Sequence, residues 1–506
     1  MAGGLALPAG DCVQAYNLVA AENGLRVRLG SREAATGLVM DTEIGVRTLM
    51  SFRGNSTRLF AATDAGIQDV SAGGTSQALE IAFATTAANA GYGSWVVVQA
   101  AGGRFGLYAD EENGLYAYTE TGNTWAKVAM GPGAGQIDGV DPDNLAFVTV
   151  HKGRVWFVEK STASAWYLPI GQVFGTAQEF PVGLSFKRGG SLVGLWSWTY
   201  DAGAGADDSL VFFSAEGDVL VYQGTDPSSA DTWGLRGVWY AGPLPAGRRI
   251  ASEFGGDLSF LTTQGLNTMS RLVVGEPNKQ AQALTEKIAN LVTVLMSQRA
   301  SFLGWSIHQH PEDNTLVIIV PQGSGDEPLQ LVQSLSTKGW FIHRGLRMTC
   351  ATVHDKQFHF GTDSGTVNIN TGYLDGIVLA DTNAYTPVDW ALLTATTDLG
   401  LPAQKQVGMI RPLILSEGGE PSVAVEARYR YSQTELDPVS LVSGTGDVWD
   451  SGLWDVALWA GQYTPSQPVR GATGMGTAVA IAIRGTSVSR TVLVGLDVTF
   501  VPGGFL

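Results

Sequence analysis

Residues 105–128 read FGLYADEENGLYAYTETGNTWAKV, and this stretch decides the fold. Two short apolar runs flank the polar turn DEENG, and a third run with a Trp follows the second turn, TGN. A short strand, a turn rich in Gly, Asp and Asn, and a returning strand form the pattern of an antiparallel hairpin. The stretch therefore predicts antiparallel β-structure.

The same pattern recurs along the first three quarters of the chain. It is found at residues 51–70, 154–168, 210–222, 258–272, 315–342 and 357–369. A strand that carries a Trp follows several of these units, with Trp125, Trp166, Trp233 and Trp340 in that last place. A four-strand unit that repeats at roughly 45 residues is typical of a β-propeller. Residues 46–380 therefore predict a propeller of six or seven blades.

One segment departs from this pattern and indicates a helix. Within NKQAQALTEKIANLVTVLMSQRA (residues 278–300), Leu284, Ile288, Leu291 and Leu295 fall on one face of a helix. Asn278 is a suitable N-cap. We expect one amphipathic helix inserted at about residues 279–300, packed on the propeller flank in preference to docking a partner protein.

Beyond residue 380 the pattern changes to five strand-like stretches, at residues 388–397, 405–415, 422–431, 476–483 and 487–500. They predict a separate sandwich-like β domain over residues 381–506. Its loop DVWDSGLWDVALWAG places Trp449, Trp454 and Trp459 five residues apart. Such aromatics could stack on sugars, but packing of the loop on its own domain is the favoured interpretation. Residues 1–45 are assigned to an N-terminal arm and platform segment.

Composition excludes several classes of protein. The 506 residues include 31 Lys and Arg against 47 Asp and Glu, a net charge of −16, so a protein that grips nucleic acid is disfavoured. A hydrophobic fraction of 44% argues against disorder. The start lacks the pattern of a signal peptide, and no run of 18 apolar residues indicates a membrane anchor. Cys12 and Cys350 cannot form a disulfide framework, although an N-terminal strand closing the last blade would bring their regions near each other.

Motifs for catalysis or metal binding are weak. The chain has no phosphate-binding Gly-rich loop that ends in Lys-Ser/Thr, and no Gly-x-Ser-x-Gly elbow. His308 and His310 share one strand face, a spacing that can bind a metal, but structural histidines are the favoured interpretation. We expect no enzyme activity, no cofactor and no metal.

Two acidic clusters are candidate sites. In DGVDPDN, Asp138, Asp141 and Asp143 lack the Gly and Glu of a calcium loop and predict a turn held by Asx hydrogen bonds. Asp207 and Asp208 are the candidates for the paired carboxylates of a glycosidase, but they sit in a Gly- and Ala-rich loop.

Three stretches resemble the tail nozzle, or tail tubular, proteins of short-tailed bacteriophages, which are β-propeller proteins. The first is LPAGDCVQAYNLVAAENGLRVRLGSREAATGL (residues 7–38), together with TLMSFRGNSTRLFAATDAGIQDV (residues 48–70). The second runs from Leu210 through GDVLVYQGTDPSSADTWGLRGVW and the GRR of residues 247–249 to FLGWSIHQHPEDNTLVIIVP. The third runs from QVGMIRPLI (residues 406–414) through VWDSGLWDVALW to VPGGFL.

The resemblance implies a homohexameric ring below a portal and head-to-tail adaptor, at the tip of the virion tail. Its central channel would retain the genome and pass double-stranded DNA during ejection without binding it specifically. Tail fibres are further possible partners, and assembly would take place in the host cytoplasm. The resemblance brings no catalytic residues and does not assign the gating loops. A ring of such acidic subunits would keep duplex phosphates away from the channel wall.

Three alternatives stay open. A head-to-tail adaptor or stopper would occupy a higher position in the same tail. A β-propeller glycosidase or lectin acting on host surface polysaccharide would need two carboxylates that converge in the propeller mouth. An intracellular scaffold that binds peptides would be monomeric and would lack the long N-terminal segment.

Overall fold

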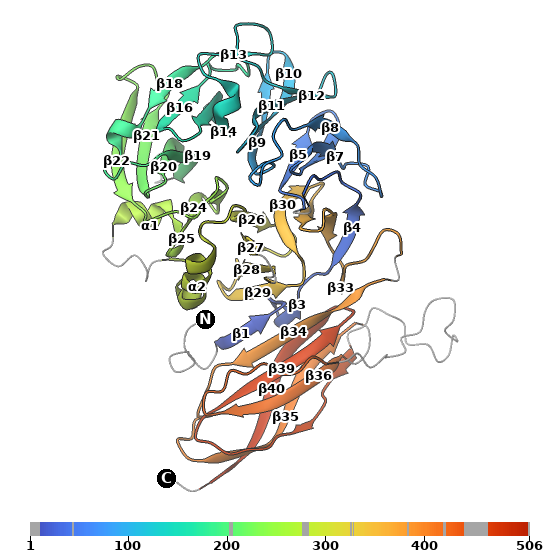
Figure 1. Cartoon of the computed structure of the whole chain (residues 1–506). Coiled ribbons are helices and arrows are strands. Elements are labelled where there is room, and N and C mark those ends of the chain that lie inside the picture. The colour runs from blue at the N-terminus through green and yellow to red at the C-terminus, as the bar shows by residue number, and fades with distance from the viewer. Residues whose placement is uncertain are drawn as a thin grey trace.

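The computed structural model describes residues 11–42, 45–201, 206–275, 283–323, 326, 328–381, 384–417, 421–439 and 464–503. They form two bodies, a ring of small sheets and an elongated β-sandwich below it (Figure 1). The Trp-containing loop of residues 447–461, and with it Trp449, Trp454 and Trp459, lies outside the described residues, as does Asn278.

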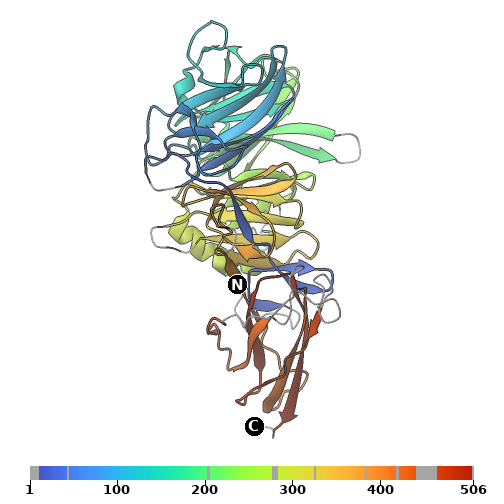
Figure 2. The same ribbon diagram turned by 90° about the vertical axis from the view of Figure 1, so that its right-hand side faces the viewer.

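The ring is a β-propeller with seven blades within the described residues, which agrees with the expected six or seven. Inner strands of neighbouring blades contact one another around the axis. From inner to outer strand, blade 1 is β5 (Thr48–Arg53), β6 (Thr57–Ala62), β7 (Gly66–Asp69) and β8 (Leu79–Ala82), blade 2 is β9 (Gly93–Ala100), β10 (Gly103–Asp110), β11 (Gly114–Thr119) and β12 (Thr124–Lys127), and blade 3 is β14 (Leu145–His151), β15 (Arg154–Glu159), β16 (Ser164–Tyr167) and β18 (Gln178–Pro181). Blade 4 is β19 (Leu192–Asp201), β20 (Ala206–Ser214), β21 (Asp218–Gly224) and β22 (Trp233–Tyr240), and blade 5 is β23 (Ala251–Phe254), β24 (Asp257–Thr262) and β25 (Gly265–Thr268). Blade 6 is β26 (Ser306–His310), β27 (Thr315–Val320), β28 (Leu329–Ser334) and β29 (Trp340–Arg344), and blade 7 is β30 (Met348–His354), β31 (Gln357–Thr362), β32 (Val367–Asn370) and β4 (Ser31–Ala35). The β19–β20 hairpin extends beyond the propeller face (Figure 2).

The hairpin of residues 105–128 forms as its sequence predicts. Strands β10 and β11 pair antiparallel from Phe105↔Thr119 to Asp110↔Gly114. Gly114 has φ +79°, and a Cβ there would lie 2.5 Å from the Cα of Asp143 in the next blade, so the turn requires glycine. In blade 3 the Trp is not in the outer strand as expected: Trp166 lies in β16, and β18 takes the edge.

The N-terminal segment closes the ring. Strand β4 pairs antiparallel with β32, so the seventh blade combines three late strands with one early strand. Strands β1 (Cys12–Tyr16), β2 (Leu18–Ala21) and β3 (Gly24–Val27) instead join the sandwich. The described part of the predicted arm at residues 1–45, residues 11–42, is thus divided between the two bodies. Local alternation marks a strand but does not choose its partner, because pairing depends on residues far away in sequence.

The helical segment takes the position of a fourth strand in blade 5. Helix α1 (Met269–Val274) follows β25, and a 3₁₀ turn (Glu286–Ile288) leads into α2 (Ala289–Arg299). Within the described residues α2 is therefore shorter than the expected helix at 279–300. Its predicted apolar face packs against blades 5 and 6: Ile288 and Leu295 are buried there, and Leu284 and Leu291 are partly buried.

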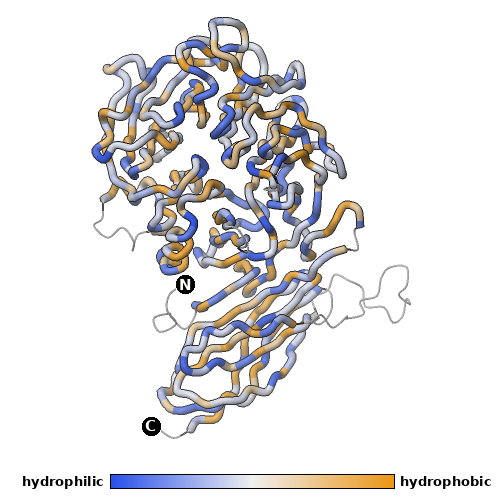
Figure 3. Tube along the Cα trace, viewed as in Figure 1, coloured by the Kyte–Doolittle hydropathy of each residue, from blue (hydrophilic) through white to orange (hydrophobic). Residues whose placement is uncertain are grey.

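All five predicted strands of the C-terminal domain form. They are β34 (Thr386–Thr394), β35 (Lys405–Ser416), β36 (Ser422–Tyr429), β39 (Val479–Ser487) and β40 (Thr491–Pro502), with the short β33 (Leu374–Asp375), β37 (Thr464–Ser466) and β38 (Arg470–Gly471) at their edges. One sheet runs β1-β34-β39-β36 and the other β2-β3-β40-β35-β37. Apolar segments occur in the strands of both bodies (Figure 3).

The propeller and the sandwich share a core. Strand β1 pairs in parallel with β29 of blade 6 and antiparallel with β34, so one sheet continues from blade to sandwich. A single hydrophobic cluster contains Phe341 and Phe360 from the propeller together with Trp390 and Ile483 from the sandwich. The two bodies are therefore joined by burial as well as by covalent connection.

Candidate functional site at the propeller axis and the interdomain junction

Three cationic or aromatic side chains stand at the face of the propeller where the inner strands begin. Arg47 directly precedes β5, Tyr92 directly precedes β9, and Arg249 lies just before β23. Since every inner strand starts at the same face, this topology brings together side chains from blades 1, 2 and 5. We call Arg47, Tyr92, Arg248 and Arg249 the axial cluster.

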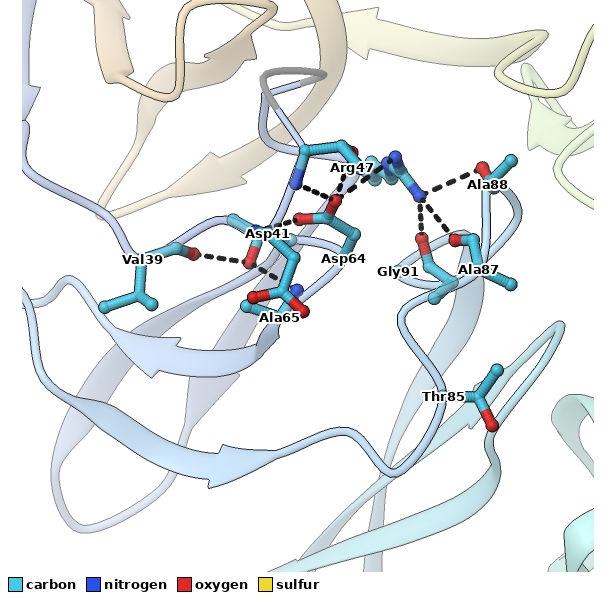
Figure 4. A network of polar contacts seen from close by, with 12 residues as sticks. Val39, Asp41, Arg47, Asp64, Ala65, Thr85, Ala87, Ala88 and Gly91 are labelled. Atoms are coloured by element: carbon cyan, nitrogen blue, oxygen red, sulfur yellow. Dashed lines mark hydrogen bonds and ion pairs between the residues drawn. The ribbon is translucent and has the colours of Figure 1, made fainter.

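Arg47 is only 1% exposed and is held by backbone carbonyls (Figure 4). Its NH1 group donates to the carbonyl oxygens of Ala88, at 3.0 Å, and of Ala90. Its NH2 group lies 3.8 Å from a carboxylate oxygen of Asp64. Carbonyl oxygens and one carboxylate therefore fix the position of this buried cation.

Asp64 is the anionic partner in this network. It accepts hydrogen bonds from the backbone NH groups of Asp41 and Thr42, at 3.1 and 2.7 Å. Burial alone would raise the pKa of Asp64, but the hydrogen bonds from residues 41–42 and the charge of Arg47 outweigh it and lower that pKa. Asp64 is thus an anion at neutral pH.

Segment 247–249 crosses from blade 5 to the opposite side of the axis. Arg249 donates to the carbonyl oxygen of Arg47 at 2.8 Å. Arg248 forms an ion pair with Glu111 of blade 2, at 2.6 Å, and donates to the carbonyl oxygen of Val193 in blade 4, also at 2.6 Å. Two adjacent arginines thus tie four blades together at this face.

The opposite face carries an acidic pocket of about 220 Å³ beside the β19–β20 hairpin, lined by Thr199, Glu253 and Asp257 among others. Burial and the charge of Asp208 raise the pKa of Glu253. Asp208 accepts a hydrogen bond from Thr199 at 2.7 Å, whereas the side chain of Asp207 lies outside the described residues. The carboxyl group that the charge of Asp208 influences is therefore Glu253, which the sequence did not indicate.

The predicted strand-face histidines have structural partners. His308 contacts Ser306 at 3.0 Å, and His310 contacts Asn370 at 2.9 Å. The His310 ring also stacks on Phe358 with 4.3 Å between centroids. Burial and the charge of Arg249 lower the pKa of His308 to about 3. Among the described residues, no three His, Cys, Asp or Glu side chains converge as metal ligands.

The acidic turn of residues 138–144 behaves as predicted. The Asp141 side chain accepts the backbone NH of Asp143 at 3.1 Å and caps a 3₁₀ turn, η1 (Pro142–Asn144). Asp143 in turn forms an ion pair with Lys127 at 2.9 Å. Its carboxylates therefore serve an Asx turn and a surface ion pair.

A second polar pocket, of about 280 Å³, lies where the propeller meets the sandwich. Arg28, directly after β3, pairs with Asp375 of β33 at 2.5 Å, and Arg484 of β39 pairs with Asp389 of β34 at 2.6 Å. Asn17 lies between them and has φ +54°. We call these five residues the junction cluster.

Asn17 uses its whole side chain in this cluster. Its Oδ1 accepts from Arg28 at 2.9 Å and from the backbone NH of Arg344 at 2.8 Å, while its Nδ2 donates to the carbonyl oxygen of Asp389 at 2.7 Å. Asn is among the few residue types that adopt a left-handed conformation readily. The residue thus turns the chain between β1 and β2 and joins the two bodies.

Sequence reasoning missed the residues of both clusters. Isolated arginines carry no motif, and their carboxylate partners lie between 17 positions (Arg47 and Asp64) and 347 positions (Arg28 and Asp375) away. One signal was available: with 15% charged residues, two adjacent arginines at 248–249 are unusual for this chain. Low overall charge makes each buried cation a candidate for a specific role.

Neither cysteine forms a disulfide. Cys350 is buried in β30 and Cys12 is partly buried in β1, and both are free thiols. Among the described residues, no helix has the length and apolar character needed to span a membrane.

Comparison with known proteins gives a likeness in fold alone. No protein-family model matches the chain, and no curated protein matches it. Similar solved structures include the extracellular domain of a hybrid two-component system from B. thetaiotaomicron (15% identity, TM-score 0.41, 68% of this chain and 43% of that chain). YCF48 bound to D1 peptide (11%, 0.38, 72% and 99%) and Raptor from Chaetomium thermophilum (9%, 0.40, 68% and 29%) are also similar. At these identities and scores the likeness carries no argument about function.

Proposed function

We propose that this chain is a structural virion protein, the tail nozzle of a short-tailed phage. Six copies would form a ring below the portal and adaptor, retain the genome and give it an exit at infection. The observation that carries the proposal, beside the resemblance of residues 7–70, is the shared core. A propeller and a sandwich joined by one cluster and one continuous sheet make a stiff subunit, as a conduit under pressure requires.

The position of the axial cluster favours a channel between subunits. The axial cluster crosses the end of the propeller, and the major groove of DNA alone is about 12 Å wide, so a duplex would not thread through a single chain. A ring of chains with net charge −16 would line a wider channel that repels phosphate. The DNA path of this proposal therefore depends on assembly.

The sandwich offers apolar side chains for contacts between copies. Met409 on β35 and Val501 on β40 are 50% and 66% exposed. Exposed apolar side chains that gather on one domain often mark protein interfaces. We expect Met409→Asp combined with Val501→Asp to reduce the hexamer to smaller species in native mass spectrometry. Leu184→Asp, at an exposed site on blade 3, is the matched control and should leave the hexamer intact.

Immunogold labelling of particles from a lysate that contains this chain tests the position in the virion. Gold at the distal end of a short tail is the expected result. Gold at the neck would favour the head-to-tail adaptor instead. Particles without label would overturn the virion assignment.

One observation favours a second candidate, a glycosidase. Glu253 has a raised pKa beside Asp208 at the edge of a pocket, as a general acid requires. A polysaccharide cleavage screen with the wild type and Glu253→Gln separates the two functions. Cleavage by the wild type that Glu253→Gln loses would establish the enzyme, whereas equal inactivity of both proteins is expected of a nozzle.

A further inference from the structure

The axial cluster holds two cations against one aromatic ring. The guanidinium carbons of Arg47 and Arg249 lie 5.2 and 5.7 Å from the centroid of Tyr92. Each contact is a favourable cation–π interaction, yet the two positive charges repel each other in a buried setting. Such an arrangement needs negative charge nearby.

The carboxylates within reach are already engaged. Asp64 lies near Arg47, and Glu111 is paired with Arg248. Asp110 accepts from the backbone NH groups of Asn113, in its own turn, and of Gly91, just before β9. Among the described residues, Arg249 has no carboxylate within ion-pair distance.

Several donors in the cluster have no acceptor. The Nε and NH2 groups of Arg47, a residue only 1% exposed, and the NH2 group of Arg249 are buried without a hydrogen-bond partner among the described atoms. Buried donors of a charged group that stay unpaired are strongly destabilising. The cluster therefore has both excess charge and unused donors.

A small cavity adjoins the Arg249 NH2 group. It is lined by Tyr92, Glu111, Arg248, Arg249, Gly304 and Trp305 among others, and about 10 Å³ of it is open to the centre of a water-sized particle. The ion pair with Arg248 neutralises the one carboxylate in this lining, that of Glu111. The Tyr92 hydroxyl points to the same space, since a Cβ built on Gly304 would lie 3.9 Å from that oxygen. So small a space favours a single monatomic particle over a polyatomic anion.

We propose that this cavity binds a single monatomic anion, of the chloride class. Arg249 NH2 and the Tyr92 hydroxyl are its donors, and Arg47 adds positive charge from the other blade. The bound anion supplies the counter-charge that Arg249 lacks and links blades 1, 2 and 5 at the axis. The site belongs to the single chain and does not depend on assembly or on the proposed function.

Thermal unfolding at constant ionic strength tests the site, with sodium chloride compared with sodium gluconate, whose anion is too large for the cavity. We expect the Tm of the wild type to be higher in chloride by roughly 2–4 °C and to rise with chloride concentration, as binding to the folded state requires. Arg249→Gln should lose this difference, and Tyr92→Phe should reduce it. Arg236→Gln, at an exposed arginine on β22, is the matched control and should retain it.

Crystals grown in sodium bromide give a second readout that does not need the variants to fold. Anomalous bromine density between Arg249 and Tyr92 is the expected result. A water molecule at that position, or equal Tm values for the wild type in chloride and gluconate, would overturn the proposal. A chloride effect that Arg249→Gln retains would also overturn it, because the anion would then bind elsewhere.

Discussion

Arg28 and Asp375, 347 residues apart in sequence, form a two-pronged ion pair at the junction of propeller and sandwich. Arg28 NH2 and NH1 donate to the two carboxylate oxygens of Asp375 at 2.5 and 2.8 Å. Arg28 is 1% exposed and also donates to Asn17 and to two backbone carbonyls. The pair fastens the N-terminal segment to β33, the short strand that follows the last blade.

Replacing Arg28 should therefore destabilise the protein strongly. In Arg28→Met, Asp375 keeps its charge without a partner, and loss of one member of a buried pair costs about 3–5 kcal/mol. Urea unfolding measures the loss. Arg411→Met is the matched control: its pair with Asp497 has the same 2.5 Å distance, but both side chains are about half exposed, so a change below about 1 kcal/mol is expected. Equal effects of the two variants would contradict this account.

A charge on the buried face of α2 should be as damaging. Ile288 precedes the helix and is packed against blades 5 and 6. Ile288→Asp buries an unpaired carboxylate and should lower the free energy of unfolding by several kcal/mol, about 3 or more. Val294→Asp, on the same helix at a side chain that is 51% exposed, should change it by less than about 1 kcal/mol. Similar unfolding curves for Ile288→Asp and the wild type would refute the packing of this helix.

Stability should fall on mild acidification. Burial, and then the charge of Lys152, lower the pKa of His151 to about 4, below the ordinary value of 6.5. Between pH 6.5 and 4, His151 binds a proton in the unfolded chain but not in the folded protein. The contribution of His151 to the free energy of unfolding is therefore complete above pH 6.5 and decreases toward pH 4. The slope from this residue is at most about 1.4 kcal/mol per pH unit.

Urea unfolding at several pH values separates His151 from the other buried histidines. His151→Gln cannot titrate and keeps a polar group for Ser197, the partner of the His151 ring at 2.8 Å. The variant should lose less stability than the wild type as the pH falls. Parallel profiles for the two proteins would assign the acid sensitivity elsewhere.

The thiols should be inert in the folded protein. Burial raises the pKa of Cys12 and of Cys350 to about 11, so little thiolate exists at pH 8. We expect no alkylation of Cys350 by iodoacetamide in native protein and full alkylation of both cysteines in urea, measured by mass spectrometry. Rapid modification of Cys350 in native protein would show that blade 7 opens readily.

The elements that the sequence predicted are local. The hairpin of residues 105–128 and the strands of the C-terminal domain form within short stretches of sequence. In these stretches the alternation of apolar and polar residues indicates which side of the strand is buried. The apolar face of α2 is likewise visible in its spacing. Its start was misjudged because residues 283–288 continue the apolar spacing through a 3₁₀ turn, where hydrogen bonds differ but side chains still face the core.

The elements that the sequence missed depend on distant partners. The pattern of residues 12–27 indicates strands, but only the folded chain shows that they join the sandwich while β4 joins the propeller. The same limit applies to the polar clusters. The residues that flank Arg28 and Arg249 in sequence do not indicate that these arginines contact Asp375 and Tyr92. The pKa of Glu253 is likewise raised by burial and by the charge of Asp208, which lies on another strand.

The closure of blade 7 by β4 has a consequence for the order of synthesis. The carbonyl oxygen of Gly30 accepts a hydrogen bond from Asn370 Nδ2, 340 positions later in the chain. Strand β4 is therefore synthesised long before β32, the strand with which it pairs. At roughly 5–20 residues per second, the ribosome needs on the order of tens of seconds to deliver that partner. Throughout this interval the nascent chain holds an incomplete ring, and β4 stays unpaired until residues 367–370 have been made.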